Sequence, residues 1–595
     1  MAIISKYFSF HFPIFKIALI IQSHFAMQYV YKKYLSLAII ATISLNILFA
    51  QTTPKTIAAD EGVVTYSFRS NGKEMKGQPP LQLFFKNNMA RLVQETNQQR
   101  KEGQYIDYNQ QATYQILTLK DNSRYTLKTP FSDYEKATLT GDTAIILGYH
   151  CKKAKVIIRS NTIEIWFTND LPIKGSPSLS IAPGLGLILK TIRNGNFETY
   201  ATKVQLRKVN DAEVNLPKNL GEIVDEATYH RKEIDNRFTT ISVFSQQQIN
   251  FTDSITNPAN NLENVTYRYA GGTLVLKKIK LPEEGNFSVF AHLTQYSNGD
   301  AYDRTGSVFI IPTDREISFL TGLNKSVHAL PLYRDKQGKE YQGVVETQQY
   351  LPPLELMRFF TPFGVRHFNE RSKIKGYNWA DSVNYEQDIT DLLPRLKGEV
   401  WIGVFIGNYD KGGHIINLNL ELHPKRTDSM KKSNWIEPLF NTLNLMEMAG
   451  QNYGTMFDND SLTVSVNIPE GLKNLTLRYI TTGHGGWGNG DEFNQKLNEI
   501  FVDGKRVYSF IPWRTDCGTY RMSNPSSGNF GDGLSSSDLS RSNWCPGTTT
   551  NPVYIPLENL SPGKHAFKIA IPLGKPEGNS FSAWNVSGCL IGEFK

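Results

Sequence analysis

Apolar and polar residues alternate with a period of two along most of the chain. In the stretch HIINLNLELHP (414–424) every second residue is apolar, and the stretches around Val464 and Phe567 follow the same rule. Residues spaced in this way line one face of a β-strand. Turn sequences such as Asn-Gly-Asp at 298–300 and Asp-Gly-Lys at 503–505 separate the stretches. The pattern predicts an all-β protein built from sandwich or jelly-roll domains.

Three segments depart from this pattern. Trp435–Met448 and Ile389–Leu396 have the spacing of short helices. Leu274, Leu276 and Ile279 break the alternation by one step, which predicts a β-bulge in that strand.

Shifts in composition divide the chain into segments. We expect a signal segment at 1–50, a β domain at 52–210, a polar linker with some helix at 211–237, and two jelly rolls at 238–424 and 433–595. The two rolls are similar in length, as paired sandwiches would be.

The N-terminal region has the order of a secretory signal peptide that starts at Met27. Lys32 and Lys33 precede an apolar run, Leu35–Ala50, and a polar stretch follows it. The alternative is a membrane anchor, but 16 residues is short for a bilayer span. No later stretch is long and apolar enough to span a membrane. We therefore expect export to the periplasm, the cell surface or the medium, without a stable membrane span.

Charge argues against nucleic acid as a partner. The formal net charge is +8, and four of these charges lie in the first fifty residues, which leaves +4 for the rest of the chain. The sequence contains no nucleotide-binding loop and no recognised metal motif, and His484 has no partner at metal-ligand spacing. We expect neither a metal nor another cofactor.

The four cysteines lie in two kinds of sequence surroundings. Cys517 and Cys545 lie in a region rich in Gly, Ser and Asn, where a disulfide would offset the entropy of a long loop. Cys151 and Cys589 follow apolar, strand-like stretches and are expected to be buried thiols.

Three clusters carry candidate chemistry. Asp300–Arg304 combines two carboxylates with an arginine, Asp491–Phe493 ends a Gly-rich stretch, and Ser540–Gly547 joins a cation, an indole and a cysteine. A carboxylate beside an arginine can stay ionised and act as a base, and a Trp face can stack on a sugar ring. The alternatives are a strand-end ion pair, a turn acid and a stapled loop with a structural Trp.

In their order along the chain, these clusters resemble segments of the bacterial peptide:N-glycosidase F family, amidases that remove N-linked glycans from asparagine. The matching segments are GDAYDRTGSVFI (299–310), RFFTPFGV (358–365), DITDLL (388–393), the Gly-rich stretch into 491–493, and RSNWCPG (541–547). The resemblance implies two eight-stranded antiparallel jelly rolls packed side by side, with the site at their interface.

The resemblance also implies a role for each matching residue. Asp303 corresponds to the principal catalytic aspartate, held ionised by Arg304, and Glu492 to the essential glutamate of the second roll. Arg541 and Trp544 correspond to residues near the two core sugars, and Cys517 and Cys545 to a family disulfide. Further substrate-binding residues are expected at these positions: Asp300, Trp487 and Phe493.

The chain departs from the family pattern at three places. The cysteine pair that precedes the catalytic aspartate is missing, and Phe493 replaces a Trp. A second glutamate of the first roll aligns near Phe405, so its role is empty or passes to a neighbour such as Asp410.

The function implied by the resemblance is that of a secreted, monomeric amidohydrolase. It would act on N-glycosylated proteins or glycopeptides and convert the glycosylated Asn to Asp. The alternatives are a lectin-like protein that binds glycans without cleaving them, and an endo-β-N-acetylglucosaminidase that cuts between the two core sugars.

The first β domain resembles a different family, the GLPGLI-type domains of Bacteroidetes. Three segments carry this resemblance: ILGYHCKKAKV (146–156), IEIWFTNDLPIKGSP (163–177) and APGLGLILK (182–190). It implies a structural or substrate-positioning unit.

Overall fold

The computed structural model describes residues 60–594 apart from 96–100, 425–434, 452, 455, 459–460, 486–489, 530–532, 558–559 and 574–581. The chain forms two compact units, Met1–Glu233 and Ile234–Lys595. The signal segment expected at 1–50 lies outside the described residues. Within the described part of the chain, no helix is long and apolar enough to cross a membrane.

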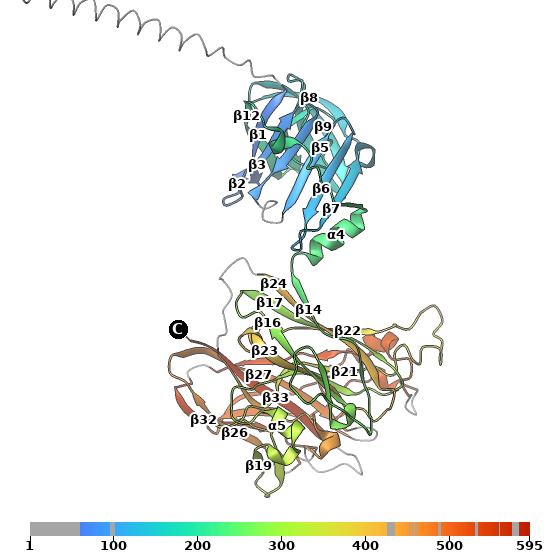
Figure 1. Cartoon of the computed structure of the whole chain (residues 1–595), viewed down its shortest axis with the longest axis vertical. Helices are drawn as coiled ribbons and strands as arrows, with labels where there is room; N and C mark the ends of the chain where they lie inside the picture. Colours follow the sequence, from blue (N-terminus) through green and yellow to red (C-terminus); the bar gives the residue numbers. More distant parts are fainter. Residues whose placement is uncertain are drawn as a thin grey trace, which may run out of the picture. The chain divides into compact units, whose positions relative to one another are not determined.

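One curled sheet of thirteen strands makes up the first unit (Figure 1). Its order is β13-β7-β6-β5-β4-β3-β1-β12-β11-β10-β9-β8, with β2 paired to β1. The strands are β1 (Glu61–Ser70), β2 (Lys73–Glu74), β3 (Leu81–Lys86), β4 (Met89–Val93), β5 (Glu102–Asp107), β6 (Ala112–Thr118), β7 (Arg124–Pro130), β8 (Thr138–Ile146), β9 (Tyr149–Ile158), β10 (Asn161–Thr168), β11 (Leu187–Arg193), β12 (Phe197–Leu206) and β13 (Glu222–Val224).

The stretch 211–237, predicted to be a linker with some helix, contributes to this sheet. It holds α3 (Asp211–Val214), β13 and α4 (Glu226–Asp235). Strand β13 pairs in parallel with β7, and Tyr229 of α4 packs on Leu117 and Leu127. The apolar side chains of this stretch are few, but they are sufficient to attach it to the edge of the sheet.

The first jelly roll of the second unit consists of two facing sheets. One has the order β14-β24-β17-β22 and the other β15-β16-β23-β18-β21-β30. Their strands are β14 (Thr239–Ile249), β15 (Thr266–Tyr269), β16 (Leu274–Leu281), β17 (Phe287–Ser297), β18 (Thr305–Ile311), β21 (Leu354–Phe360), β22 (Val383–Asp388), β23 (Gly398–Ile406) and β24 (His414–Pro424), joined by β30 (Thr549–Thr550). A small hairpin of β19 (Leu332–Arg334) and β20 (Glu340–Gln342) follows α5 (Phe319–Asn324).

The second jelly roll repeats this architecture. Its sheets are β25-β33-β27-β31 and β26-β32-β28-β29. The strands are β25 (Trp435–Asn441), β26 (Leu462–Ile468), β27 (Leu472–His484), β28 (Asn498–Val502), β29 (Lys505–Phe510), β31 (Val553–Pro556), β32 (Gly563–Ala570) and β33 (Ala583–Phe594). The predicted all-β, paired jelly-roll fold is therefore confirmed.

The alternating residues face the cores, as predicted. Ile416 and Leu420 of β24 are fully buried in the core of the first roll, and Val464 and Phe567 lie in that of the second. The Asp-Gly turn at 503–504 closes the β28–β29 hairpin with positive φ at both residues, a geometry that Gly accepts without strain.

Two predictions of local structure are wrong. Strand β16 keeps its register with β23 throughout, without a bulge. The alternation breaks there because β16 is buried on both faces: Val275 and Ile279 face the core of the roll, while Leu274 and Leu276 face a second apolar cluster. The expected helix at Trp435–Met448 begins instead as strand β25, whose residues are buried on both faces.

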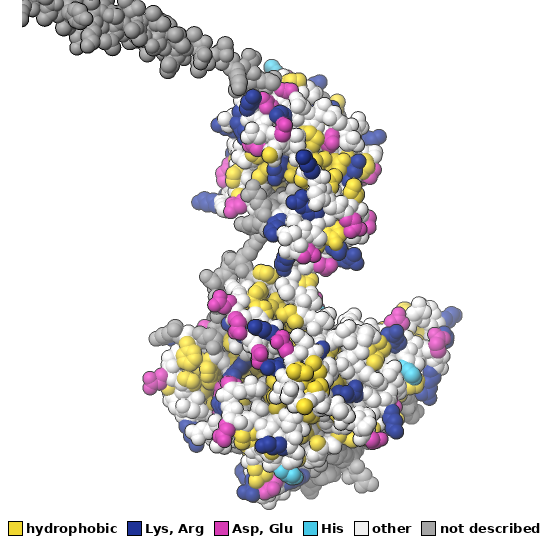
Figure 2. Space-filling view, viewed as in Figure 1, with side chains coloured by type: hydrophobic (Ala, Val, Ile, Leu, Met, Phe, Trp, Pro, Cys, Tyr) yellow, Lys and Arg dark blue, Asp and Glu magenta, His cyan; other side chains and the backbone are white. Residues whose placement is uncertain are grey.

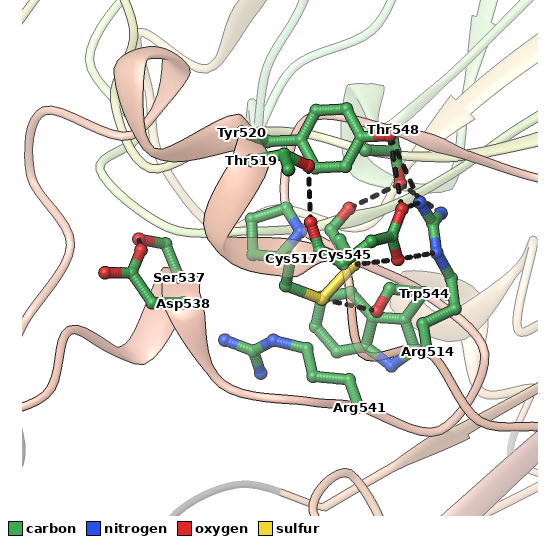
Figure 3. The surroundings of a disulfide bond; sticks show 12 residues. Arg514, Cys517, Thr519, Tyr520, Ser537, Asp538, Arg541, Trp544, Cys545 and Thr548 are labelled. Atoms are coloured by element: carbon green, nitrogen blue, oxygen red, sulfur yellow. Dashed lines mark hydrogen bonds and ion pairs between the residues drawn. A yellow bond between two sulfur atoms is a disulfide. The ribbon is translucent and has the colours of Figure 1, made fainter.

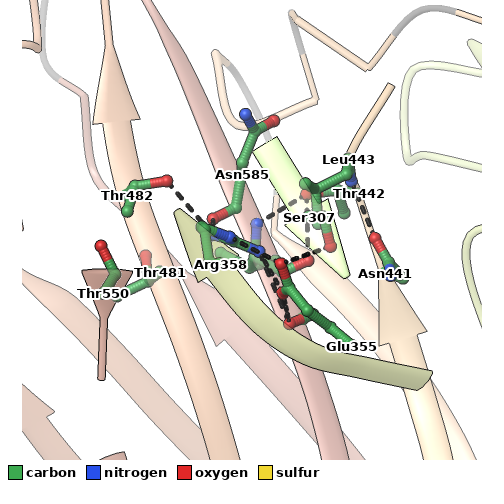
Figure 4. Close-up of polar contacts among 12 residues, drawn as sticks. Ser307, Glu355, Arg358, Asn441, Thr442, Leu443, Thr481, Thr482, Thr550 and Asn585 are labelled. Atoms are coloured by element: carbon green, nitrogen blue, oxygen red, sulfur yellow. Dashed lines mark hydrogen bonds and ion pairs between the residues drawn. The ribbon is translucent and has the colours of Figure 1, made fainter. Parts of the chain in front are cut away.

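A buried polar network joins the two rolls (Figure 4). Arg358 of β21 forms an ion pair with Glu355 and donates hydrogen bonds to the carbonyl oxygen of Asn585 at 2.6 Å and to Thr482 Oγ1 at 3.1 Å. The side chain of Arg358 has no exposed surface. Because a buried guanidinium is stable only when it is paired, this network fixes β21 of one roll against β27 and β33 of the other.

Candidate functional site

Residues from the three candidate clusters meet at one guanidinium group. Arg541 Nη2 lies 3.5 Å from Asp303 Oδ2, and Arg541 Nη1 is paired with Glu492 Oε1. Asp303 comes from the connection between β17 and β18 of the first roll, whereas Glu492 and Arg541 come from loops of the second. The seam between the rolls therefore brings together acids that are far apart in the sequence.

Arg541 is held from several sides. Its side chain has no exposed surface, and Nη2 donates to the carbonyl oxygen of Ser536 at 2.7 Å and to its hydroxyl at 3.0 Å. The guanidinium carbon lies 4.7 Å from the ring centre of Phe493 and 4.6 Å from that of Trp544. Burial lowers the pKa of Arg541 to about 10 despite the attraction of Asp303, so the group stays protonated at neutral pH.

Asp303 is a carboxylate of this site whose pKa is raised toward neutral pH. Burial raises its pKa to about 6, although Arg541 and Arg304 act in the opposite direction. Its side chain keeps 16% of its surface exposed. A carboxyl group with these properties can exchange a proton with a bound molecule near neutral pH.

We expected Arg304 to pair with Asp303. In the structure, its side-chain hydrogen bonds go to Asp300 instead. Its Nε donates to Asp300 Oδ2 at 2.8 Å and its Nη2 to Oδ1 at 3.3 Å. Burial alone would raise the pKa of Asp300, but hydrogen bonds from His414 and Arg304 outweigh it and lower the pKa to about 2. Asp300 is thus ionised at neutral pH and buried, with 2% of its surface exposed, so it anchors Arg304 and does not present a surface to a substrate.

His414 supports this anchor and was not among the predicted site residues. Its Nε2 lies 3.5 Å from Asp300 Oδ2, and its Nδ1 is hydrogen-bonded to Gln295 Nε2 at 2.9 Å. The sequence did contain a signal, because His414 shares the alternating face of Ile416 and Leu418. A polar residue at a buried position of a strand needs a partner in the fold.

Two exposed tyrosines border Arg304 on its open side. The guanidinium carbon lies 5.0 Å from the ring centre of Tyr302 and 5.7 Å from that of Tyr409. The tyrosines are 61% and 55% exposed, respectively, while the side chain of Arg304 keeps 22% of its surface.

Glu492 is positioned through its backbone neighbours. Ser542 donates its amide to the carbonyl oxygen of Glu492 at 3.0 Å and its hydroxyl to that of Asp491 at 2.6 Å. The side chain of Asp491 accepts a hydrogen bond from Trp584 Nε1 at 2.8 Å. The two loops that carry Glu492 and Arg541 are therefore joined side by side.

A disulfide supports the loop that carries Arg541 (Figure 3). Cys517 and Cys545 are bonded, as predicted, and Cys151 and Cys589 are buried free thiols. Trp544, next to the disulfide, is only 3% exposed and donates from Nε1 to the carbonyl oxygen of Gly483 at 2.8 Å.

The expectation that Trp544 stacks on a sugar is not supported by this geometry. Its indole is stacked on Phe360 at 4.3 Å and also lies against Arg541. Because its ring is covered by Phe360 and Arg541, Trp544 supports the arginine and is not open to a ligand.

The remaining predicted positions divide into three cases. Phe493 lies half-buried against Arg541, whereas Trp487 falls outside the described residues. Phe405 is buried in an apolar cluster. Asp410 Oδ1 accepts hydrogen bonds from the amides of Gly412 and Gly413, both at 2.7 Å, so this carboxylate caps a turn. No group of three or more potential metal ligands is found among the described residues.

Charge on the molecular surface is mixed. In the face shown in Figure 2, basic and acidic side chains are interspersed over both units, without an extended patch of one sign.

Comparison with known proteins gives three family matches. Residues 64–231 match the family described as N-glycanase peptide, N-terminal domain; residues 240–422 match Peptide-N-glycosidase F, N terminal; and residues 452–591 match Peptide-N-glycosidase F, C terminal. The first match links the N-terminal unit to the same enzymes. Its resemblance to GLPGLI-type domains stays a prediction.

Among solved structures, the chain is similar to PNGF-II, which is known in two crystal forms. Both are 48% identical to it over 90% of this chain, with TM-scores of 0.79 and 0.82 and with 98% and 100% of PNGF-II covered. PNGase F, a glycosylasparaginase from Flavobacterium meningosepticum, is 14% identical over 60% of this chain and 96% of its own, with a TM-score of 0.40. No curated protein sequence matches the chain.

Proposed function

Because the chain belongs to the peptide:N-glycosidase F family, we propose that it is an amidohydrolase that cleaves the bond between an N-linked glycan and its asparagine. The observation that carries this proposal is the meeting of Asp303 and Glu492 on the buried guanidinium of Arg541. One of these two acids has a pKa of about 6 and is partly exposed, which suits a general base.

In the proposed reaction, ionised Asp303 takes a proton from a water molecule, and the oxygen of that water bonds to the side-chain amide carbon of the glycosylated asparagine. The carbon–nitrogen bond then breaks, and the proton passes from Asp303 to the leaving nitrogen. The products are an aspartate in the peptide and a glycosylamine, which loses ammonia in water. Atoms and charge balance without a further reactant.

Arg541 acts in this scheme as a positioning residue. Since its side chain is fully buried and already contacts Asp303, Glu492 and Ser536, it fixes the acids in relation to each other. A fixed geometry of the acids lowers the entropy cost of reaching the transition state.

Glu492 and Arg304 are proposed to bind the sugar next to the asparagine. Glu492 is 14% exposed and offers carboxylate oxygens to hydroxyl groups, directly or through water. Arg304, in the Asp300–Arg304 segment of the first roll, offers N–H donors to the same sugar. It is fixed by its hydrogen bonds to Asp300 and bordered by Tyr302 and Tyr409.

One assay separates this proposal from its two alternatives. A denatured N-glycoprotein is incubated with the protein, and the peptides are analysed by mass spectrometry. Conversion of the glycosylated Asn to Asp supports an amidase. An Asn that retains one sugar indicates an endo-β-N-acetylglucosaminidase, and an unchanged glycopeptide that binds to the protein indicates a lectin. Asp303→Ala, with an unchanged circular dichroism spectrum, should lose the activity; an unchanged rate would contradict the assignment.

We further propose that the protein is exported. The signal-like sequence from Met27 to Ala50 and the Cys517–Cys545 disulfide both support this location, because disulfides persist mainly in oxidising compartments. Fractionation of expressing cells, with and without residues 1–50, tests the proposal. Retention of the full chain in the cytoplasm would contradict it.

A further inference from the structure

His484 lies at the edge of the candidate site and has no role in the mechanism described above. It is the last residue of β27 and leads into the loop that carries Glu492. Its ring centre lies 5.6 Å from that of Trp544 and 5.7 Å from that of Phe360. Trp544 in turn lies against Arg541. His484, Phe360 and Trp544 therefore form one aromatic layer beside the arginine that pairs with the two acids.

A hydrogen-bonded chain from the seam between the rolls ends at this histidine. Arg358 Nη1 donates to Thr482 Oγ1 at 3.1 Å, and Thr482 Oγ1 lies 2.9 Å from His484 Nε2. A guanidinium can only donate, so the Thr482 oxygen accepts from it. Among the described residues, the Thr482 hydroxyl has no acceptor other than His484 Nε2, so its proton is directed there and Nε2 accepts.

This chain fixes the form of the imidazole. When Nε2 accepts, the ring is neutral and carries its proton on Nδ1. The cationic surroundings favour the same state, because burial, Arg358 and Arg541 lower the pKa of His484 to about 3. The ring is therefore neutral over the whole range in which Asp303 changes its ionisation.

The Nδ1–H group of this neutral ring is available to a ligand. No hydrogen bond to Nδ1 is found among the described residues, and the side chain is partly exposed. A neutral donor suits this position. A second positive charge beside the buried Arg541 would repel its guanidinium and compete for the carboxylates that pair with it.

We propose that His484, fixed by Thr482 as the Nδ1–H tautomer, is a substrate-binding residue that donates a hydrogen bond to an uncharged carbonyl or hydroxyl oxygen of the sugar attached to asparagine. This inference rests on the proposed function for the identity of the ligand. Thr482 and Arg358 act through His484 as positioning residues.

Two pairs of variants test the proposal with a chitobiosyl glycopeptide as the probe. His484→Phe keeps an aromatic ring but removes both nitrogens, and it should raise KM by about tenfold with a smaller change in kcat. His484→Asn can place an amide N–H near the Nδ1 position and should stay within about threefold of the wild type. His328→Asn, at an exposed histidine of the same unit, is the matched control.

The second pair tests the control of the tautomer. Thr482→Val removes the hydroxyl group and should raise KM by about threefold to tenfold, whereas Thr482→Ser restores it. The acid limb of the pH–rate profile should be the same in the wild type and in His484→Phe, because the ring does not ionise there. Loss or displacement of that limb in His484→Phe would overturn the proposal, as would a KM within twofold of the wild type.

Binding measurements separate failure of this inference from failure of the proposed function. Calorimetric titration of the glycopeptide into each variant gives Kd without any turnover. If the wild type binds but does not cleave, the amidase proposal fails, and a Kd raised about tenfold in His484→Phe still supports the role of His484. If the wild type cleaves and His484→Phe binds equally well, only the role of His484 is refuted.

Discussion

Asp303 and Asp300, three positions apart, should respond to neutralisation in opposite ways. The pKa of Asp303 is raised from 3.8 to about 6, which corresponds to ~3 kcal/mol. A raised carboxyl pKa means that the ionised form is less stable in the folded protein, so folding stability is lost as pH rises through 6. Asp303→Asn should therefore be more stable than the wild type at pH 8, by up to ~3 kcal/mol, and nearly equal to it at pH 4.

Asp300 provides the matched control of opposite sign. Its pKa is lowered from 3.8 to about 2, which corresponds to ~2.5 kcal/mol of stability that is present above pH 4 and lost as pH falls through 2. Asp300→Asn should be less stable than the wild type at pH 8 by about this amount.

The measurement for both variants is urea unfolding followed by tryptophan fluorescence, between pH 4 and pH 8. Asp303→Asn should also be inactive, so a residue that lowers the stability of the fold would be one that the reaction needs. If Asp303→Asn is destabilised at pH 8, or if its difference from the wild type does not depend on pH, the conclusion that the fold disfavours the ionised form of Asp303 is refuted.

Three further outcomes are expected. The rate of glycopeptide cleavage should fall by about tenfold per pH unit below pH 6 as Asp303 takes up its proton, and a flat profile from pH 5 to pH 8 would contradict this. Cys517→Ser with Cys545→Ser, which opens a 28-residue separation, should lower the free energy of unfolding by about 3.5 kcal/mol, measured in urea. Glu355→Gln should cost ~3 kcal/mol by leaving the buried charge of Arg358 uncompensated, and a loss below 1 kcal/mol would contradict the role of this pair at the seam.

The sequence was most informative where one physical rule decides the structure. Period-two alternation identified the buried faces of β24 and β26, because a strand with one buried face must place its apolar residues at every second position. The same rule failed at β16, where apolar clusters lie on both faces and the alternation no longer marks one side. It failed again at Trp435–Asn441, a strand buried on both faces.

Three of the predicted site residues lie together in the structure, but their contacts could not be predicted from the sequence. Asp303, Glu492 and Arg541 were found by resemblance to a family, since no local pattern reports contacts between two rolls. The partner of Arg304 was assigned to its neighbour Asp303, whereas the path of the loop brings it to Asp300. Trp544 was expected to bind a sugar, but it is 3% exposed, because a sequence shows the chemistry of a side chain and not what covers it.

The most direct test of the central claim is cleavage of an N-glycopeptide in water enriched in oxygen-18. If Asp303 activates water for attack on the asparagine amide, the product peptide contains aspartate with one labelled oxygen, and Asp303→Asn yields none. A peptide that keeps one sugar on an unlabelled asparagine, or an equal rate of labelling in Asp303→Asn, would contradict the account.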